Sequence, residues 1–325
     1  MTYDGRERAA RDEEDAMRIL VVGASGAIGS RLVPQLRAQG HEVIGSSRSA
    51  GKAARLRELG AEPVVLDVLD GPATHQLVAR VEPDAIVHQA TALAGGGFSR
   101  KLDTTFALTN QLRTRGTDNL LDAARAAGVT RFVAQSFAPY RYAHQGGPAR
   151  AEDDPLVTSP PASAGQTFAA MSHVDDAVTA AGGIALRYGG FYGDHDAMVK
   201  AVQKRRYPVV GDGSGLMSFI HLDDAATATV LALGHEGPAI YNITDDEPAA
   251  TRDWLPALAA AVGARPPRHF PTWVGRLVMG DGLDMMTGAR GAANTRAKKE
   301  LDWTLAYPSW RQGFPASLGR GRPAG

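Results

Sequence analysis

The feature that most constrains the fold of this chain is an apolar run that leads directly into three spaced glycines. Residues 18–22 read Arg-Ile-Leu-Val-Val, and glycines follow at positions 23, 26 and 29. The apolar run predicts a buried strand, and the apolar periodicity after Gly29 predicts a helix. Unpaired N–H groups at the start of such a helix face an anion, so this layout predicts a cradle for dinucleotide phosphates. The chain holds 37 glycines, so a purely structural turn is the alternative.

The residues that follow the next strands indicate which dinucleotide is bound. The second strand ends in Ser46, Ser47 and Arg48, without a carboxylate. A guanidinium and hydroxyls suit the 2′-phosphate of NADP, whereas an acid at this place favours NAD. We therefore predict NADP as the cofactor, with NAD possible; the alternative for Arg48 is a solvated loop cation. The predicted contacts in these segments are Gly23, Ser25, Gly26, Ala27, Ile28, Gly29, Ser47, Arg48, Asp67 and Val68, the last two beside the adenine.

Composition excludes several classes of protein and partner. The chain has 325 residues with 35 basic and 35 acidic side chains, so its charge indicates neither nucleic acid nor an anionic membrane as a partner. It contains no cysteine, which excludes disulfides and thiolate ligands, and its histidines lack the spacing of a metal site. No apolar run approaches the roughly 20 residues of a membrane span. We expect a cytoplasmic protein that acts on a small molecule.

Apolar runs alternate with amphipathic segments along most of the chain, which is typical of a doubly wound α/β sheet. Residues 1–16 are charged and are predicted to be a disordered leader, residues 17–190 a Rossmann domain, residues 191–314 a smaller α/β substrate lobe interleaved with it, and residues 315–325 a disordered tail. Strands are predicted at 18–22, 42–46, 63–66, 84–88, 131–135 and 183–188, and helices at 27–39, 50–59, 72–80, 104–127 and 166–181. In the second part we expect strands at 218–221 and 239–243 and helices at 223–233, 251–262 and 272–279.

Several motifs resemble one family, the extended short-chain dehydrogenases/reductases or NAD-dependent epimerases/dehydratases. Besides the glycine turn they include Gly116-Thr-Asp-Asn-Leu-Leu-Asp-Ala-Ala124, Leu186-Arg-Tyr-Gly-Gly-Phe-Tyr-Gly193 and Ser218-Phe-Ile-His-Leu-Asp-Asp224. The resemblance covers about residues 17–312 and implies a Rossmann domain with a C-terminal substrate lobe. It also implies a possible homodimer through the helices at 104–127 and 166–181, and cofactor contacts from Gln89, Ala90, Arg113 and Tyr188.

The chain departs from this family at the residues that handle the proton. Typical members use a Tyr, a Lys four residues later and a Ser, because the cation lowers the pKa of the phenol and the hydroxyl binds the substrate oxygen. None of the eight tyrosines here is followed by Lys at that spacing. Thr167 and Met171 stand where Tyr and Lys are expected, and Phe137 stands at the Ser position. Met217 replaces a phosphate-binding Arg, which argues against a nucleotide-sugar substrate.

Another residue must therefore supply the proton if this chain reduces a carbonyl. We predict Tyr140, Tyr192 and Ser136 as catalytic residues, with packing or loop solvation as the alternative for each. The other polar candidates near the cleft are Tyr142, His144, His173, Tyr188 and His195. The pocket is expected to be apolar, with Leu93, Phe98, Phe137, Phe168, Phe191, Met198, Leu216 and Met217 as candidate linings.

These observations predict an NADP(H)-dependent oxidoreductase that acts on a small, hydrophobic carbonyl or enone with a non-standard proton donor. Two alternatives stay open, because the glycine turn determines what is bound and not what is done. One is a non-catalytic NADP-binding regulator or redox sensor, and the other is a non-redox biosynthetic enzyme such as a cyclase or isomerase on the same fold.

Overall fold

The computed structural model describes residues 16–93, 101–194, 197–280 and 282–318. The leader predicted for 1–16 lies outside these ranges except for its last residue. The candidate residues His195 and Phe98 also lie outside them.

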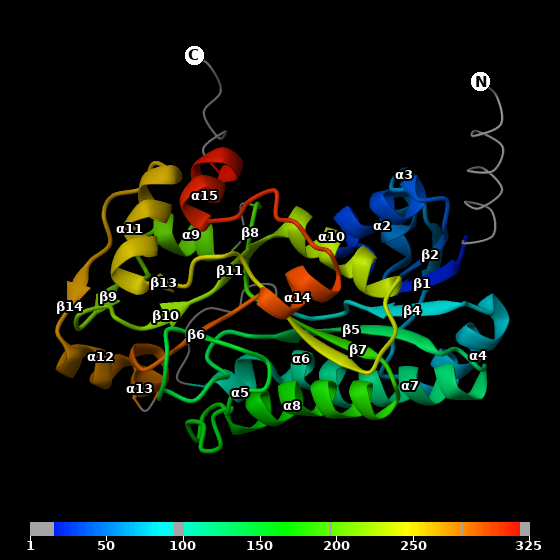
Figure 1. Ribbon diagram of the computed structural model, residues 1–325, viewed down its shortest axis with the longest axis horizontal. Coiled ribbons are helices and arrows are strands. Elements are labelled where there is room, and N and C mark those ends of the chain that lie inside the picture. The colour runs from blue at the N-terminus through cyan, green and yellow to red at the C-terminus, as the bar shows by residue number, and fades with distance from the viewer. Residues whose placement is uncertain (1–15, 94–100, 195–196, 281, 319–325) are drawn as a thin grey trace, which may run out of the picture.

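A parallel sheet of seven strands forms the centre of the molecule (Figure 1), in the order β12-β7-β5-β4-β1-β2-β3. The strands are β1 (Arg18–Val22), β2 (Glu42–Ser47), β3 (Glu62–Val65), β4 (Ala85–His88), β5 (Arg131–Phe137), β7 (Ile184–Tyr188) and β12 (Ala239–Ile243). Most of these strands are buried on both faces, which is why they read as continuous apolar runs in the sequence. The doubly wound Rossmann fold is confirmed, and the predicted strand bounds agree to within two residues.

Helices cover both faces of the sheet and enclose two apolar cores. One face is covered by α2 (Gly29–Ala38), η1 (Ala50–Lys52), α3 (Ala53–Glu58), α10 (Leu222–Leu233) and α14 (Thr295–Glu300). The other carries α4 (Gly71–Val81), α5 (Leu102–Thr105), α6 (Ala107–Gln111), η2 (Leu112–Gly116), α7 (Thr117–Ala126) and α8 (Gly165–Ala180). Side chains of each strand alternate between the two cores, as Leu20 and Val21 do.

The single helix predicted for 104–127 is wrong in one respect, because the chain forms four consecutive helical pieces there. α5 and α6 are short, and η2 is a π-helical segment that leads directly into α7. A π segment inserts an extra residue into a helix and is frequent at functional sites. Here it contains Arg113, whose side chain is buried.

The strand predicted for 239–243 forms as expected, but it belongs to the central sheet and not to the lobe. β12 pairs in parallel with β7, with Tyr241 opposite Leu186. Without β12, the backbone groups of β7 would form an unpaired sheet edge. The preceding helix α10 packs against α2 of the Rossmann domain, so the chain returns to the sheet after its first passage through the lobe.

The lobe contains short strand pairs and a separate apolar core. The pairs are β8 (Gly190–Tyr192) with β11 (Phe219–His221), β9 (Val209–Val210) with β14 (His269–Phe270), β10 (Leu216–Met217) with β13 (Ala249–Ala250), and β6 (Ala149–Arg150) with β15 (Gly291–Ala292). Its helices are α9 (Ala197–Gln203), α11 (Thr251–Ala261), α12 (Thr272–Met279), α13 (Gly282–Thr287) and α15 (Trp310–Leu318). Buried Trp254, Phe219 and Phe314 belong to this core.

Helix α15 corrects the predicted start of the disordered tail. Residues 315–318 form the last turn of this helix. Phe314 and Leu318 are four residues apart on one helical face, and both are buried in the core of the lobe. The burial of Leu318 explains why order extends beyond the predicted boundary at 314.

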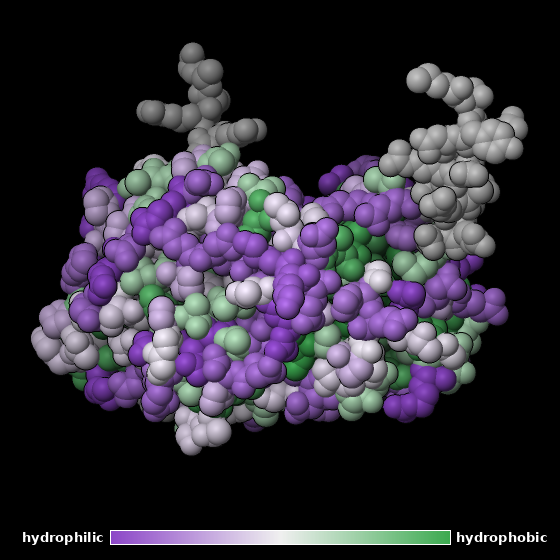
Figure 2. All heavy atoms as spheres, in the orientation of Figure 1, coloured by the Kyte–Doolittle hydropathy of each residue, from purple (hydrophilic) through white to green (hydrophobic). Residues whose placement is uncertain are grey.

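The surface shown in Figure 2 is mixed in character. Hydrophilic residues spread over both the sheet domain and the lobe, and hydrophobic residues appear between them in smaller areas. Among the described residues, no helix is long and apolar enough to cross a membrane.

Candidate active site

The glycine turn has the geometry of a phosphate cradle. Gly23 has φ +85°, and a Cβ atom there would lie 2.9 Å from the backbone of Ala90. Gly29 is the first residue of α2, and a Cβ atom there would lie 2.6 Å from the backbone of Ala24. Gly26 and Ala27 are exposed, and no side chain caps α2, whose N-cap residue is Ile28. The N–H groups of Ser30 and Arg31 donate to the carbonyls of Gly26 and Ile28. The N–H groups of Ala27, Ile28 and Gly29 therefore remain for an anion, which fits a dinucleotide pyrophosphate.

The residues predicted to select the cofactor lie at the carboxyl ends of β2 and β3. Arg48 is exposed and follows β2 directly, Ser47 is half-buried, and buried Ser46 accepts a backbone hydrogen bond from Ala24. Asp67 is exposed, and its carboxylate accepts a hydrogen bond from the N–H of Leu69 at 3.1 Å. This arrangement leaves the Arg48 guanidinium open to a phosphate. The assignment of Arg48, Asp67 and Val68 to the cofactor stays a prediction.

Gln89 lies beside the glycine turn and is fixed at both ends. Its backbone N–H donates to Val22, and its side-chain Nε2 donates to the hydroxyl of Tyr188 at 3.1 Å. The Oε1 atom of Gln89 is buried without a hydrogen-bond partner among the described residues. An unpaired buried acceptor beside a phosphate cradle fits a bound dinucleotide.

Tyr188 takes a different role from the predicted one. It is fully buried in the core beneath the cofactor site, and its hydroxyl also contacts Thr229 at 2.6 Å. Burial raises the pKa of Tyr188 to about 12. Tyr188 therefore positions Gln89, and its predicted contact with the cofactor stays a prediction.

The positions that would hold the proton relay lie together at the junction of β5 and α8. The hydroxyl and the N–H of Thr167 both donate to the carboxylate of Asp103 at 2.8 Å, so Thr167 fixes the start of α8. Met171 and Phe137 belong to one apolar cluster. The cluster also contains Ala164, Phe168, Met285, Leu102, Tyr140, Val157 and Met286. No side chain of Thr, Met or Phe can replace an acidic phenol beside an ammonium group.

Tyr140 borders this apolar cluster and stays a candidate site residue. It is half-buried in the loop after β5, and its φ of +66° lies in the left-handed region that bulky residues avoid. Its hydroxyl lies 3.8 Å from the sulfur of Met217. Burial raises the pKa of Tyr140 to about 12. The phenol therefore remains protonated at neutral pH and can donate a hydrogen bond, but it is a weak acid.

The structure overturns the predicted positions of Tyr192 and Ser136. Tyr192 was expected on a loop facing the cleft, but it lies in β8 with 2 % exposure and makes edge contacts with Phe219 and Phe314. Ser136 is completely buried, and its hydroxyl accepts a hydrogen bond at 3.4 Å from Arg141. Strand alternation turns Ser136 toward α8, and both side chains are buried, so the structure does not favour the catalytic roles predicted for them.

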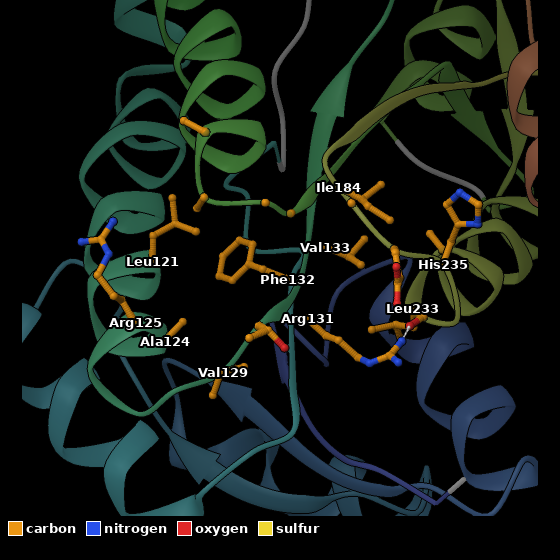
Figure 3. A pocket seen from close by; sticks show the side chains of 18 of the residues that line it. Leu121, Ala124, Arg125, Val129, Arg131, Phe132, Val133, Ile184, Leu233 and His235 are labelled. Carbon is orange, nitrogen blue, oxygen red and sulfur yellow. Dashed lines mark hydrogen bonds between the residues drawn. The ribbon is translucent and has the colours of Figure 1, made fainter.

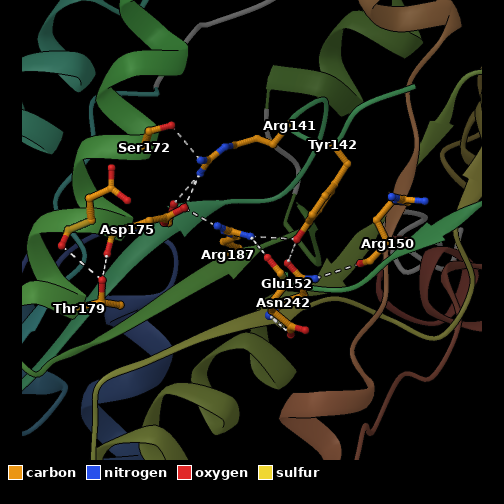
Figure 4. A network of polar contacts seen from close by, with 11 residues as sticks. Arg141, Tyr142, Arg150, Glu152, Ser172, Asp175, Thr179, Arg187 and Asn242 are labelled. Atoms are coloured by element: carbon orange, nitrogen blue, oxygen red, sulfur yellow. Dashed lines mark hydrogen bonds and ion pairs between the residues drawn. The ribbon is translucent and has the colours of Figure 1, made fainter. Parts of the chain in front are cut away.

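A buried ionic network lies behind Ser136, and the sequence did not reveal it (Figure 4). Oδ2 of Asp175 accepts hydrogen bonds at 2.8 Å from both Arg141 and Arg187. Arg187 also donates to the hydroxyl of Tyr142 at 3.1 Å, and Tyr142 donates to Asn242 at 2.7 Å. The network therefore joins α8, β7, β12 and the segment after β5. The signal for it was an arginine within the otherwise apolar strand 183–188.

The remaining histidine candidates do not converge on the cleft. Nε2 of His173 lies 2.6 Å from the carboxylate of Asp118 on the neighbouring helix α7. His144 packs closely against Gly288 near the end of α13. Tyr142 belongs to the ionic network. In the described ranges, no group of histidines and acids is arranged to hold a metal.

Arg113 lies on η2, next to the carboxyl end of β4. Its side chain is 5 % exposed, and its Nε atom is buried without a hydrogen-bond partner. Burial and the neighbouring charge of Arg141 lower the pKa of Arg113 to about 10, so it stays charged at neutral pH. The preceding residue, Leu112, contacts Nε2 of His88 through its carbonyl at 3.3 Å, and burial lowers the pKa of His88 to about 4. Arg113 was predicted to contact the cofactor, and this stays a prediction; the structure places its side chain in a buried position beside the carboxyl end of β4.

A groove of about 650 Å³ lies at the opposite edge of the sheet (Figure 3). It is lined by the amino-terminal ends of β5 and β7 and by the end of α10, including Arg131, Ile184 and Leu233. Dinucleotides bind at the carboxyl ends of the strands in such sheets. The groove is therefore separate from the candidate active site.

The fold and the glycine turn together define a dinucleotide-binding enzyme of the oxidoreductase type. Residues 19–244 match the model of the NAD dependent epimerase/dehydratase family. The chain belongs to this family, which confirms the resemblance seen in the sequence.

Known relatives include both reductases and epimerases. A 3-diazoavenalumate denitrifying reductase of Streptomyces is 40 % identical over 92 % of this chain and 99 % of its own. A UDP-glucose 4-epimerase of Mycolicibacterium smegmatis is 31 % identical over 88 % and 93 %. Among solved structures, the UDP-glucose 4-epimerase of Thermus thermophilus in complex with NAD has a TM-score of 0.70 at 25 % identity and covers 94 % of this chain and 99 % of its own. These relatives support a nicotinamide cofactor.

Proposed function

We propose that this protein is an NADPH-dependent reductase that replaces the diazo group of an aromatic compound with hydrogen and releases dinitrogen. The observation that carries the proposal is the apolar cluster at the relay positions, where Met171 and Phe137 pack together and Thr167 is engaged by Asp103. The Streptomyces reductase, whose name describes a diazo substrate and a denitrifying reaction, supports it.

The proposed reaction explains why a proton relay is dispensable. Reduction of a carbonyl adds a hydride to carbon and needs a proton for the oxygen, which family members take from a tyrosine. An aryl diazonium ion that gains one hydride loses dinitrogen and becomes a neutral arene. One carbon–nitrogen bond breaks, one carbon–hydrogen bond forms, and charge balances without a proton. A bound nicotinamide supplies this hydride.

The described side chains then bind and orient the reactants. The uncapped start of α2 holds the pyrophosphate, and Arg48 pairs with the 2′-phosphate. Gln89, fixed by Tyr188, contacts the ribose next to the nicotinamide. The cluster around Met171 and Phe137 packs against the aromatic ring and excludes water, which would otherwise react with the diazo group.

The test follows the transferred hydrogen. The purified protein is incubated with an aryl diazo carboxylate and NADPH that carries deuterium at nicotinamide C4, and the arene is analysed by mass spectrometry. We expect one deuterium at the carbon that held nitrogen, at a rate far above that of the Gly29→Val variant, which serves as the control for uncatalysed reduction. Product without deuterium, or no excess over that control, contradicts the proposal. Tight NADPH binding without any turnover favours a regulator instead.

The second candidate function is reduction of a small carbonyl or enone, with Tyr140 as proton donor. The position of Tyr140 beside the apolar cluster favours it. A 2-alkyl-3-oxoalkanoate reductase of Stenotrophomonas maltophilia is 30 % identical over 76 % of this chain and 76 % of its own, which also supports this candidate. A ketone and enone panel assayed beside the diazo substrate shows which class of substrate the protein reduces. Only carbonyl reduction depends on the Tyr140 hydroxyl, so Tyr140→Phe should lower that activity alone.

A further inference from the structure

The charge of Arg113 is not balanced by any side chain that the structure describes. Its Nε atom is buried without a hydrogen-bond partner, and the guanidinium forms no ion pair with the described residues, although the side chain is 95 % buried. A buried charge without a partner costs free energy, so proteins seldom retain one. A ligand that supplies the missing negative charge resolves this cost.

The carboxylate whose charge acts on Arg113 is already shared by two other arginines. Asp175 lies close enough to Arg113 to influence its charge, but its Oδ2 atom accepts hydrogen bonds from Arg141 and Arg187 at 2.8 Å. Glu152 adds one further carboxyl group near Arg187, and burial raises the pKa of that group. Glu152 is itself paired with Arg296 at 3.7 Å, so Asp175 is the carboxylate left among the described residues for Arg113, Arg141 and Arg187, and an excess of positive charge results.

The position of Arg113 relates this excess charge to the active site. Arg113 lies on η2 beside His88, which ends β4, and Gln89 and Ala90 of the cofactor site follow directly. Nδ1 of His88, Oε1 of Gln89 and Oδ1 of Asn110 are also buried without partners within the described part of the chain. Unsatisfied polar atoms thus collect at the carboxyl end of β4, where a substrate would meet the nicotinamide.

We infer that Arg113 is a specificity-determining residue that binds a carboxylate of the substrate. This inference rests on the proposed function and deepens it, since it defines the substrate as an organic acid. The hydroxyls of the nicotinamide ribose are neutral and are satisfied by a neutral amide, so they do not account for a buried full charge. A carboxylate does, because a guanidinium pairs with it through two parallel hydrogen bonds. The substrate named for the Streptomyces relative is likewise an organic anion.

The test compares an acid with its uncharged amide. Cinnamate and cinnamamide are titrated into the protein saturated with NADP⁺, and their affinities are measured by calorimetry. We expect the wild-type protein to bind cinnamate at least ~10-fold more tightly than cinnamamide, as a charge-assisted contact implies. Arg113→Gln should lower the affinity for cinnamate by ~10-fold to 100-fold. It should leave the affinities for cinnamamide and NADP⁺ within ~2-fold of the wild-type values. Arg113→Lys should keep part of the preference, and Arg115→Gln, a change on the exposed part of the same helical segment, should keep all of it.

Three results would overturn the inference. They are equal wild-type affinity for the acid and the amide, an equal loss of both ligands in Arg113→Gln, and a loss of NADP⁺ affinity with the acid preference intact. The wild-type comparison needs no variant, so the inference stays testable even if Arg113→Gln does not fold. The probes are unreactive: a protein that prefers the acid but reduces no diazo compound refutes the proposed function and not this inference.

Discussion

Nε of Arg187, in the buried strand β7, lies 2.8 Å from Oδ2 of Asp175 on helix α8. This contact crosses from the sheet to the helix layer, and Arg141 binds the same oxygen from the segment after β5. Both side chains of the first pair are at least 96 % buried. The contact therefore fixes α8, which holds Thr167 and Met171, relative to the end of the sheet.

Asp175→Asn should destabilise the fold strongly. The change leaves two buried guanidinium groups without their shared carboxylate, and loss of one partner from a buried ion pair costs about 3–5 kcal/mol. Urea unfolding followed by circular dichroism measures the change. Asp176→Asn is the matched control, since Asp176 is the exposed neighbour on α8, and it should change the free energy of unfolding by less than about 0.5 kcal/mol. Equal effects in the two variants would refute the structural role of the network.

Gly26→Ala should separate cofactor binding from stability. Gly26 is exposed, and the added Cβ atom would meet only the carbonyl oxygen of Gly23, at 3.2 Å, a tight contact that a small shift of this exposed turn would relieve. The same methyl group projects toward the pyrophosphate and should lower the affinity for NADPH by ~10-fold or more. Fluorescence titration measures the affinity, and Gly165→Ala at the open start of α8 serves as the control. Unchanged NADPH affinity in Gly26→Ala argues against the cradle.

Arg48→Ala should discriminate between the two nicotinamide cofactors. Removal of a charge-assisted contact to the 2′-phosphate should lower the affinity for NADPH by ~10-fold and leave the affinity for NADH within ~2-fold. Arg55→Ala removes an exposed arginine of α3 that pairs with Glu58 and is the control. If NADPH and NADH lose affinity equally, or if NADH binds more tightly to the wild-type protein, the predicted NADP preference is wrong.

Turnover of a diazo substrate should depend little on pH between 6 and 9. Burial lowers the pKa of His88 to about 4 and raises the pKa of Tyr140 to about 12, so His88 stays neutral and Tyr140 stays protonated across this range. Tyr140→Phe should accordingly retain kcat within ~3-fold, because the reaction needs no protein acid. Initial rates over the pH range test both statements. A ~100-fold lower kcat in Tyr140→Phe would indicate that Tyr140 is a proton donor and would support carbonyl reduction.

The sequence contained enough information for the layers of the fold, because parallel strands buried on both faces leave continuous apolar runs. It did not contain the register of the helix at 104–127, since the π segment around Arg113 depends on packing against α8 and the sheet. Tyr192 shows a second limit. A tyrosine after a strand is equally compatible with a cleft and with a core, and only the lobe contacts from Phe219 and Phe314 decide.

The contribution of β12 to the central sheet has a consequence for how this protein can be divided. The chain leaves the sheet after β7, builds part of the lobe, returns for α10 and β12, and then continues into α11. A cut after β7 therefore divides the apolar core under α2 and α10, because Ile19 of β1 and Ile243 of β12 both belong to it. The cofactor-binding and substrate-binding parts are therefore not separable at this point of the sequence. Recombination at residue 190 with a related enzyme would exchange the outermost strand of the sheet, β12, together with the substrate lobe.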